Sequence, residues 1–318
     1  MAGTKLSDKH QEELKKADIR GPGAVLQVSE FGLLRIGSLN SAEADSLSTS
    51  AAATVLNPGF TTALESENSL EKWKRLSTGC HILDHALGGG FPARGITELA
   101  GESGCGKTQL CLQLCLGVQY SQSQGGFNSG AVYICTEDSF PTNRLQQLFH
   151  TYSRRRGVCG SAKNFGDNIF IEHIADAAGM RQCVLGRLPK LMTSQRVGLI
   201  VIDSVAGIFR SSYENNEIRN RAEDMRVVAG QLHKIAAEYG VCIICVNQVT
   251  ASDGPERCIP ALGLAWSNLV TTRIQLHLME PNGIDGAPHR SLQVVFAPDL
   301  PEATVPYTVS EAGVFGLS

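Results

Sequence analysis

The sequence predicts an α/β protein with a mostly parallel central sheet, preceded by a small helical unit. Three observations predict this class. From residue 76 onward, apolar β-rich runs alternate with helical stretches, as in parallel strands covered by helices on both faces. Residues 101–108 match a phosphate-binding loop between such a strand and such a helix. The first 55 residues have the pattern of a short helical unit.

The chain is expected to contain three segments. Residues 1–55 form the helical unit, residues 56–75 a polar linker with the apolar segment GFTTAL, and residues 76–318 the α/β domain. Helical patterns in the first segment cover Leu6–Ala17, Gly23–Phe31 and Ala42–Ala53. Ser41 is the expected N-cap of the last helix, because a serine side chain can accept a hydrogen bond from the first turn.

The α/β domain contains a series of candidate strands. They read GITELAG, AVYICTE, NIFIEHI, GLIVID, VCIICVN, TRIQLHL, LQVVFAP and YTVSEAGV. The later runs follow one another closely, which predicts that the sheet ends in antiparallel pairs.

Composition limits the classes of function. The 318 residues are 42% hydrophobic and 19% charged, and the formal net charge is -3. DNA binding would therefore depend on local basic patches, because the chain as a whole has no positive charge. Neither a signal peptide nor an apolar run long enough to cross a bilayer is expected.

The 10 cysteines are expected to be free thiols in a reducing compartment. Cys242 and Cys245 form a CxxC pair on a predicted strand, where residues three apart point to opposite faces. Buried strand cysteines are therefore favoured over a metal site. Cys111 and Cys115 are expected to pack in the core.

The phosphate loop reads GESGCGKT and matches G-x-x-x-x-G-K-[ST]. Glycines allow backbone N–H groups to face the phosphates, and the following helix adds its dipole. Lys107 is expected to contact the β- and γ-phosphates and the Thr108 hydroxyl to bind Mg²⁺. The predicted ATP-binding residues here are Gly101, Glu102, Ser103, Gly104, Cys105, Gly106, Lys107 and Thr108.

Polar residues end three of the predicted strands. Asp203 ends GLIVID, where it is expected beside the phosphate loop as part of the magnesium site. Glu137, followed by Asp138, ends AVYICTE and is the candidate general base that polarises the attacking water. Asn247–Gln248 ends a third strand, where the amides could sense the γ-phosphate or orient water. An ordinary polar strand end is the alternative for this pair.

These motifs, in this order, resemble the RecA/RadA family of strand-exchange recombinases over nearly the whole chain. The resembling segments are RLSTGCHILDHALGGGFPARGITELAGESGCGKTQLCLQL, YICTEDSFPTNRLQQL, LIVIDSVAGIFR, PALGLAWSNLVTTRIQL and APDLPEATVPYTVSEAGV. The resemblance implies a RecA-like ATPase core that uses ATP and Mg²⁺. It also implies that Arg144 stacks on adenine and that Pro301 caps the ATP of a neighbouring subunit. The short segment Val249–Leu262, at the family's second DNA loop, favours a recombinase paralogue over the strand-exchange enzyme itself.

The resemblance also implies partners. GFTTAL is similar to the family's subunit-linking segment, so Phe60 and Ala63 are expected to enter pockets on a related paralogue of the C type or on the recombinase itself. The expected assembly is a hetero-oligomer in the nucleus, and also in the cytoplasm. Its implied role is homologous recombination repair of double-strand breaks, with weak, DNA-stimulated ATP hydrolysis.

DNA contacts are expected from two polar segments where the family's DNA loops emerge. These are Ser211–Arg221 and Val249–Leu262, with Arg219, Arg221 and Arg257 contacting phosphates of single-stranded or branched DNA.

Several alternatives remain open. The family's N-terminal hairpin usually has a glycine where this chain has Leu39–Asn40, so a packing role for that unit competes with DNA binding. The run Arg154–Arg156 is interpreted as a solvated helix end rather than a phosphate-binding patch. Two other functions compete with DNA repair: a RecA-fold ATPase with a non-DNA substrate, and an adaptor in which ATP is structural.

Overall fold

The computed structural model divides the chain into two units, Met1–Ser69 and Leu70–Ser318. The residues that it describes are 12, 14, 19, 21–26, 28, 30–37, 39–55, 62–64, 74–155, 165–213, 217–251, 258–279 and 290–317.

The first unit contains three described helices around a small apolar core. They are α2 (Pro22–Val25), α3 (Glu30–Gly37) and α4 (Ser41–Val55). The predicted helix Gly23–Phe31 is wrong as a single element, because α2 ends at Val25. A tighter turn follows, in which the Val28 N–H donates to the Val25 carbonyl at 3.2 Å, and this turn lets Val28 pack on the core. The predicted helix Leu6–Ala17 lies mostly outside the described residues.

Helix α4 is capped by Asn40 and not by Ser41. The Glu43 N–H donates to Asn40 Oδ1 at 2.9 Å, and the Asn40 N–H donates to Glu43 Oε2 at 2.9 Å. This reciprocal pair is a capping box, which satisfies two backbone donors at the helix start. Ser41 is already the first helical residue, so the predicted cap was wrong by one position.

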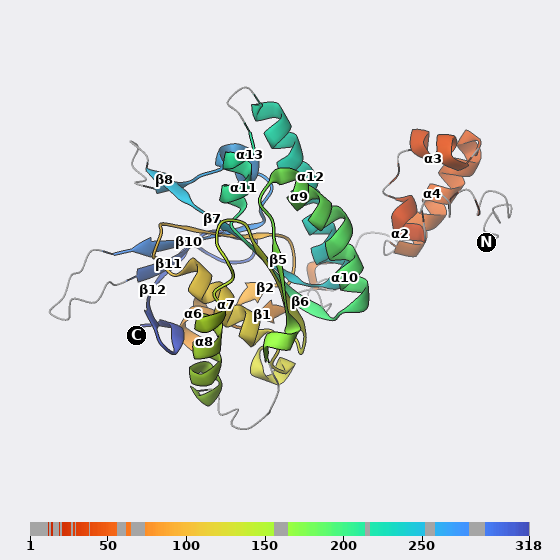
Figure 1. The fold of residues 1–318 in the computed structure, drawn as a ribbon. Helices are drawn as coiled ribbons and strands as arrows, with labels where there is room; N and C mark the ends of the chain where they lie inside the picture. Colours follow the sequence, from red (N-terminus) through yellow and green to blue (C-terminus); the bar gives the residue numbers. More distant parts are fainter. Residues whose placement is uncertain are drawn as a thin grey trace. The chain divides into compact units, whose positions relative to one another are not determined.

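The second unit is built on a nine-stranded sheet with the order β13-β12-β11-β10-β3-β7-β6-β4-β5 (Figure 1). The strands are β3 (Thr97–Gly101), β4 (Gly130–Cys135), β5 (Ile169–His173), β6 (Val197–Asp203), β7 (Cys242–Asn247), β10 (Thr272–Leu278), β11 (Arg290–Phe296), β12 (Ala303–Ser310) and β13 (Gly313–Gly316). From β10 to β5 the pairs are parallel, and from β10 to β13 they are antiparallel. The predicted fold class and the antiparallel end of the sheet are therefore confirmed.

One predicted strand divides into two. The run YTVSEAGV contains the end of β12, a turn at Glu311–Ala312 and the start of β13. The turn is possible because Gly313 adopts a φ of 118°, a value that side-chain-bearing residues rarely take. The chain therefore folds back on itself and adds the edge strand β13.

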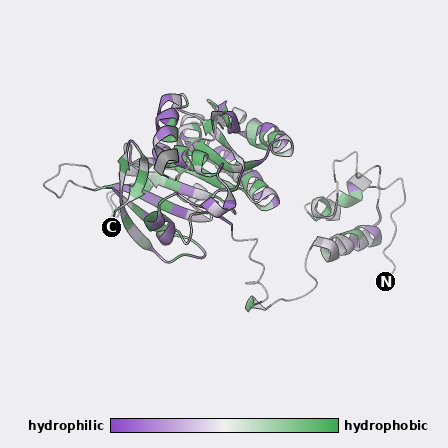
Figure 2. Cartoon of the chain, turned by 90° about the horizontal axis from the view of Figure 1, so that it is seen from below, coloured by the Kyte–Doolittle hydropathy of each residue, from purple (hydrophilic) through white to green (hydrophobic). Residues whose placement is uncertain are grey.

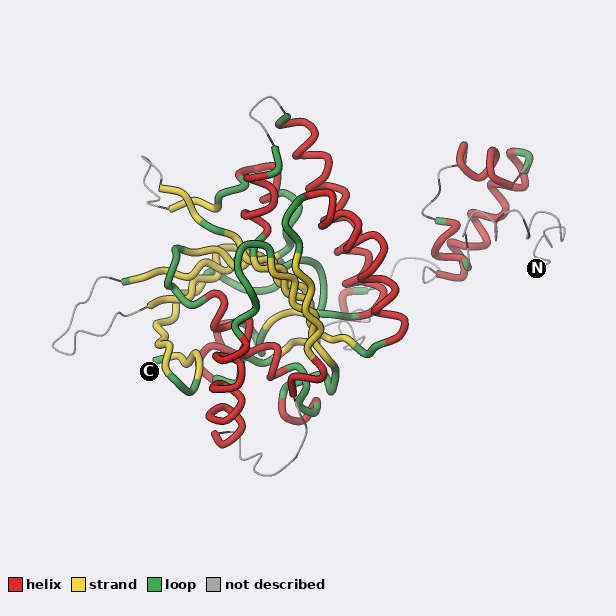
Figure 3. The backbone as a smooth tube through the Cα atoms, viewed as in Figure 1, coloured by secondary structure: helices red, strands yellow, loops and turns green. Residues whose placement is uncertain are grey.

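Helices cover both faces of the sheet (Figure 3). One face packs against α6 (His81–Ala86), α7 (Lys107–Gly117) and α8 (Thr142–Arg155). The other packs against α9 (Ala177–Gln182), the π-helical turn η4 (Cys183–Arg187), α10 (Leu188–Ser194), α11 (Val205–Ser211), α12 (Ile218–Tyr239) and α13 (Gly263–Ser267). Hydrophobic residues run through the strands between these layers (Figure 2).

The shorter elements lie outside this nine-stranded sheet. They are β1 (Arg75–Leu76) paired with β2 (Phe91–Pro92), β8 (Val249–Ala251) paired with β9 (Cys258–Pro260), and the 3-10 turns η2 (Gln122–Gln124) and η3 (Phe165–Asn168). Among the described helices, none has the length and apolarity needed to cross a bilayer.

The buried cysteines are core residues, as predicted. Cys242 packs with the core on the α7 face, and Cys245 with the core on the α12 face, so the two thiols point away from each other. Cys111 and Cys115 lie in the first core. Burial raises the pKa of all four thiols far above the usual range, so they stay protonated and pack as small apolar groups.

A buried ion pair joins the middle strands of the sheet. Glu98 on β3 is fully buried and accepts a hydrogen bond from Arg273 Nε on β10 at 2.5 Å. Its other oxygen accepts from Asn247 Nδ2 on β7 at 2.7 Å. The Arg273 guanidinium also donates to Ser267 Oγ at 2.6 Å. An unpaired charge buried at this position would raise the free energy of the folded domain. Stable packing of each of the three strands therefore depends on the other two.

Candidate nucleotide-binding site

The phosphate loop connects β3 to α7, as its sequence predicts. Gly104 and Gly106 adopt φ values of 79° and 105°, in the region that favours glycine. A Cβ on Gly101 would lie 2.5 Å from the Leu276 carbonyl oxygen, so a side chain there would collide with β10. These glycines allow the loop to fold tightly at the N-terminus of α7, where the helix dipole favours an anion.

Side chains outside the loop hold it in place. The Tyr307 hydroxyl donates to the Cys105 carbonyl, and Arg290 Nε donates to the Gly104 carbonyl at 3.3 Å. Lys107 Nζ donates to the carbonyls of Gly101 and Glu102, each at 2.7 Å. The loop is thus supported from β11 and β12 as well as by its own lysine.

The Cys105 thiol belongs to the phosphate loop itself. It is fully buried, and burial raises its pKa although the nearby Lys107 ammonium opposes this shift. Cys105 therefore supports the loop as a neutral group.

Asp203 lies beside the first turn of α7. Thr108 Oγ1 donates to Asp203 Oδ2 at 2.9 Å, and the Tyr133 hydroxyl donates to the same oxygen at 2.6 Å. Strands β4 and β6 are neighbours with Cys135 opposite Asp203, which puts the Tyr133 ring within reach. Burial raises the pKa of Tyr133 well above its usual value, so its hydroxyl remains a donor to this carboxylate. A hydroxyl and a carboxylate are hard oxygen ligands of the kind that Mg²⁺ prefers.

Glu137 is held by a separate set of bonds. Its Oε1 accepts from Ser204 Oγ at 2.9 Å, and Gln248 Nε2 lies 2.8 Å from Oε1 and 3.0 Å from Oε2. Gly207 on α11 leaves space for this carboxylate, since a Cβ there would lie 2.4 Å from Oε1. The Gln248 amide oxygen in turn accepts from Arg210 Nη1 at 3.5 Å, a long contact at the site's edge. The arrangement fixes the direction of the Glu137 carboxylate.

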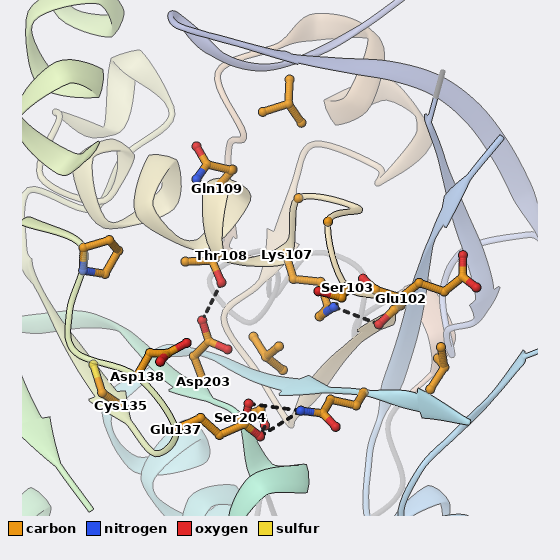
Figure 4. A pocket seen from close by; sticks show the side chains of 18 of the residues that line it. Glu102, Ser103, Lys107, Thr108, Gln109, Cys135, Glu137, Asp138, Asp203 and Ser204 are labelled. Atoms are coloured by element: carbon orange, nitrogen blue, oxygen red, sulfur yellow. Dashed lines mark hydrogen bonds between the residues drawn. The ribbon is translucent and has the colours of Figure 1, made fainter. Parts of the chain in front are cut away.

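These groups line one cavity of about 800 Å³ (Figure 4). Its lining comprises Gly101, Glu102, Ser103, Gly104, Gly106, Lys107, Thr108, Gln109, Tyr133, Cys135, Glu137, Asp138, Ser139, Pro141, Asp203, Ser204, Val246, Gln248, Val249, Arg290 and Val309. The structure therefore brings together the loop, Asp203, Glu137 and Gln248. Chemically, the cavity offers the Lys107 ammonium to bind phosphate and the oxygens of Thr108 and Asp203 to bind a divalent ion. The Glu137 carboxylate has a fixed direction in which it could bind a water molecule.

Three residues predicted to bind ATP lie outside this lining: Cys105, which is fully buried, Arg144 and Pro301. Arg144 Nε donates to Gln109 Oε1 at 2.6 Å, and its Nη2 donates to the Ser310 carbonyl at 2.6 Å. The guanidinium therefore binds the turn between β12 and β13. Its contact with Gln109, which lines the cavity, connects it to the site. Pro301 is exposed and does not line the cavity of its own chain.

The two predicted amides, Asn247 and Gln248, have different surroundings, because β7 ends at Asn247. Gln248 contacts Glu137, whereas Asn247 is fully buried against Glu98 and lines no part of the cavity. Successive residues on a strand point to opposite faces, which explains the difference. Only Gln248 is therefore placed to act on a nucleotide.

The remaining predicted residues have varied positions. Arg219 and Arg221 lie on the first turns of α12 rather than on a loop, with Arg219 exposed and Arg221 partly buried. Ala63 is exposed. Phe60 and Arg257 lie outside the described residues, as does the end of the run Arg154–Arg156.

Sequence reasoning missed several residues of the site. Tyr133, Ser204 and Arg290 were not predicted, and each contacts a residue that is far away in the sequence. Ser204 had a detectable signal, because a serine directly after a strand is a common N-cap and its Oγ indeed accepts the Gly207 N–H at 3.1 Å.

Comparisons with known proteins identify the family of this chain. The Rad51 family model matches residues 71–316. The chain belongs to the Rad51 family. A Bos taurus protein named "DNA repair protein XRCC3" is 40% identical over 320 residues, covering 96% of this chain and 94% of that protein. The Mus musculus protein of the same name is 38% identical, covering 80% of this chain and 78% of that protein.

A more distant relative is "DNA repair protein rhp57" of Schizosaccharomyces pombe. It is 30% identical, covering 76% of this chain and 79% of that protein. The resemblance to a RecA-type recombinase paralogue is therefore confirmed for this Rad51-family chain, and its relatives include proteins named for DNA repair.

Proposed function

We propose that this chain binds ATP with Mg²⁺ at residues 101–108 and hydrolyses it weakly, as a DNA-stimulated subunit of a recombinational DNA-repair complex. The observation that carries the proposal is the convergence of Lys107, the Thr108–Asp203 pair and the Glu137–Gln248 pair on one cavity. The names of the XRCC3 relatives support a role in DNA repair, and such a role favours the nucleus as its location.

The residues present fit a magnesium–nucleotide complex. Thr108 and Asp203 supply hard oxygen atoms 2.9 Å apart, which suits Mg²⁺ rather than a soft metal. Bound there, the ion would neutralise charge on the phosphates. Lys107 binds the phosphates, Glu137 accepts the proton of the attacking water, and Gln248 orients Glu137. Arg144 is proposed to stack on the adenine base, and Pro301 is proposed to cap the ATP of a neighbouring subunit.

The competing functions make different predictions about turnover. A DNA-repair ATPase should hydrolyse ATP faster when single-stranded DNA is added, whereas an ATPase with a non-DNA substrate should not respond. An adaptor with structural ATP should bind one nucleotide and show no single-turnover cleavage, even with its partner present. The assay uses the chain together with the protein that co-purifies with it.

Charge reversal on α12 tests the proposed DNA contacts. We expect Arg219→Glu combined with Arg221→Glu to weaken single-stranded DNA binding and to reduce its salt dependence, because phosphate contacts release counterions. Fluorescence anisotropy at several salt concentrations measures both quantities. Arg187→Glu is the matched control, because Arg187 lies on η4 and pairs with Glu172 at 2.9 Å. Equal affinity and equal salt slope for the double variant and the wild type would contradict this assignment.

A second test concerns assembly through the linker. We propose that Phe60 and Ala63 anchor this chain to a related paralogue or to the recombinase, as the family resemblance implies. Burial of an aromatic anchor at an interface centre commonly dominates affinity, so Phe60→Glu should weaken association by more than tenfold. Sedimentation and co-purification with each candidate partner measure this, with Leu64→Glu, at an exposed neighbouring position, as the comparison. Intact complexes with Phe60→Glu would show that assembly uses another surface.

A further inference from the structure

Asp138 is a carboxylate of the cavity to which neither the sequence motifs nor the proposed mechanism assigns a role. It follows Glu137 in the bend after β4, is exposed and lines the cavity. Figure 4 shows its side chain directed toward Asp203 and Thr108, whereas Glu137 turns to Ser204 and Gln248. The two consecutive acids therefore face different parts of the site.

The charge of the cavity favours a divalent cation. Its lining contains four carboxylates, Glu102, Glu137, Asp138 and Asp203, against two cationic side chains, Lys107 and Arg290. A triphosphate adds further negative charge beside these acids. The two carboxylates on the Thr108 side would repel the phosphates of a metal-free nucleotide and attract the cation of a metal-bound one.

The protein supplies only part of a coordination sphere. Within the described residues, no group of three His, Cys, Asp or Glu side chains is arranged to hold an ion by itself. Magnesium in ATPase sites is typically bound by one or two carboxylates together with substrate phosphates and water. Asp138 and Asp203 with the Thr108 hydroxyl match that pattern.

We propose that Asp138 is a second carboxylate of the cation site, acting with Asp203 and Thr108 to hold the divalent ion of a metal–nucleotide complex. This inference rests on the proposed ATP binding. In this proposal, Asp138 contributes to the dependence of nucleotide binding on the divalent ion. Glu137 remains the residue that accepts the proton of the attacking water.

The test is a Mg²⁺ titration of nucleotide binding by the full chain. A fluorescent, non-hydrolysable ATP analogue is bound at increasing Mg²⁺ concentrations by the wild type and by Asp138→Asn. We expect the variant to need roughly fivefold to tenfold more Mg²⁺ for half-maximal binding, because a charge near the ion is lost. Electron paramagnetic resonance of Mn²⁺ with the same analogue should show weaker ion binding. In EDTA, the variant should bind the analogue more tightly than the wild type.

Two further variants make the outcome specific. Asp138→Glu keeps the charge and should restore a metal requirement close to that of the wild type. Glu238→Gln removes one negative charge from the exposed C-terminal end of α12, outside the cavity lining, and should leave the requirement unchanged.

Each contrary result identifies what has failed. If nucleotide binding by the wild type depends on Mg²⁺ and Asp138→Asn needs the same Mg²⁺ concentration for half-maximal binding, this inference alone is overturned. Slower single-turnover cleavage at an unchanged metal requirement also overturns it, because Asp138 would then act on water. If the wild type binds no nucleotide at any Mg²⁺ concentration, the proposed function and this inference both fail.

Discussion

Glu137→Gln is expected to retain ATP and to slow its cleavage by about 10²–10⁴-fold, the usual contribution of a positioned general base. Glutamine keeps the volume of the side chain, and its amide oxygen can still accept a hydrogen bond from Ser204 or Gln248. The amide cannot accept the proton of the attacking water. Binding and chemistry should therefore separate in this variant.

Single-turnover cleavage of bound ATP is the measurement, made on the chain with its co-purified partner and single-stranded DNA. Gln248→Ala should have a smaller effect, because it removes a group that orients Glu137 and leaves the base itself. Glu238→Gln serves as the charge control. An unchanged cleavage rate in Glu137→Gln would assign hydrolysis to another residue or to the partner.

Lys107→Ala is expected to weaken ATP binding tenfold to a hundredfold. It removes a charge-assisted contact worth about 1.5–3 kcal/mol. The same ammonium also donates to the Gly101 and Glu102 carbonyls, so its loss affects the loop as well. Lys107→Met keeps most of the aliphatic stem and separates the effect of charge from that of packing.

Titration with a fluorescent ATP analogue measures both variants. If charge dominates, Lys107→Met should bind as weakly as Lys107→Ala, and Lys190→Ala on the surface of α10 should bind as the wild type does. Equal affinity for wild type and Lys107→Ala would remove the basis for a phosphate site at this loop.

The sequence predicts the centre of this site well because the motif and the strand ends obey local rules. Asp203, Glu137 and Gln248 each follow an apolar run, and the carboxyl ends of parallel strands meet at one edge of a sheet. That rule suffices to place them beside the phosphate loop without knowledge of strand order. Their roles in catalysis remain predictions.

Residues whose position depends on strand order were not predictable. Tyr133 contacts Asp203 only because β4 lies next to β6 in a particular register, and Arg290 contacts the loop from β11. The N-cap at Asn40 was missed for a local reason, since both Asn40 and Ser41 can cap a helix and the capping box with Glu43 decides between them.

The buried Glu98–Arg273 pair has a consequence for synthesis of the chain on the ribosome. Glu98 emerges 175 positions before Arg273, and Asn247 emerges 149 positions after Glu98. Until β10 has been translated, β3 cannot enter the middle of the sheet without burying a carboxylate that lacks its counter-charge. The nascent domain should therefore remain incompletely folded, with its phosphate loop unsupported, until most of its length has left the exit tunnel.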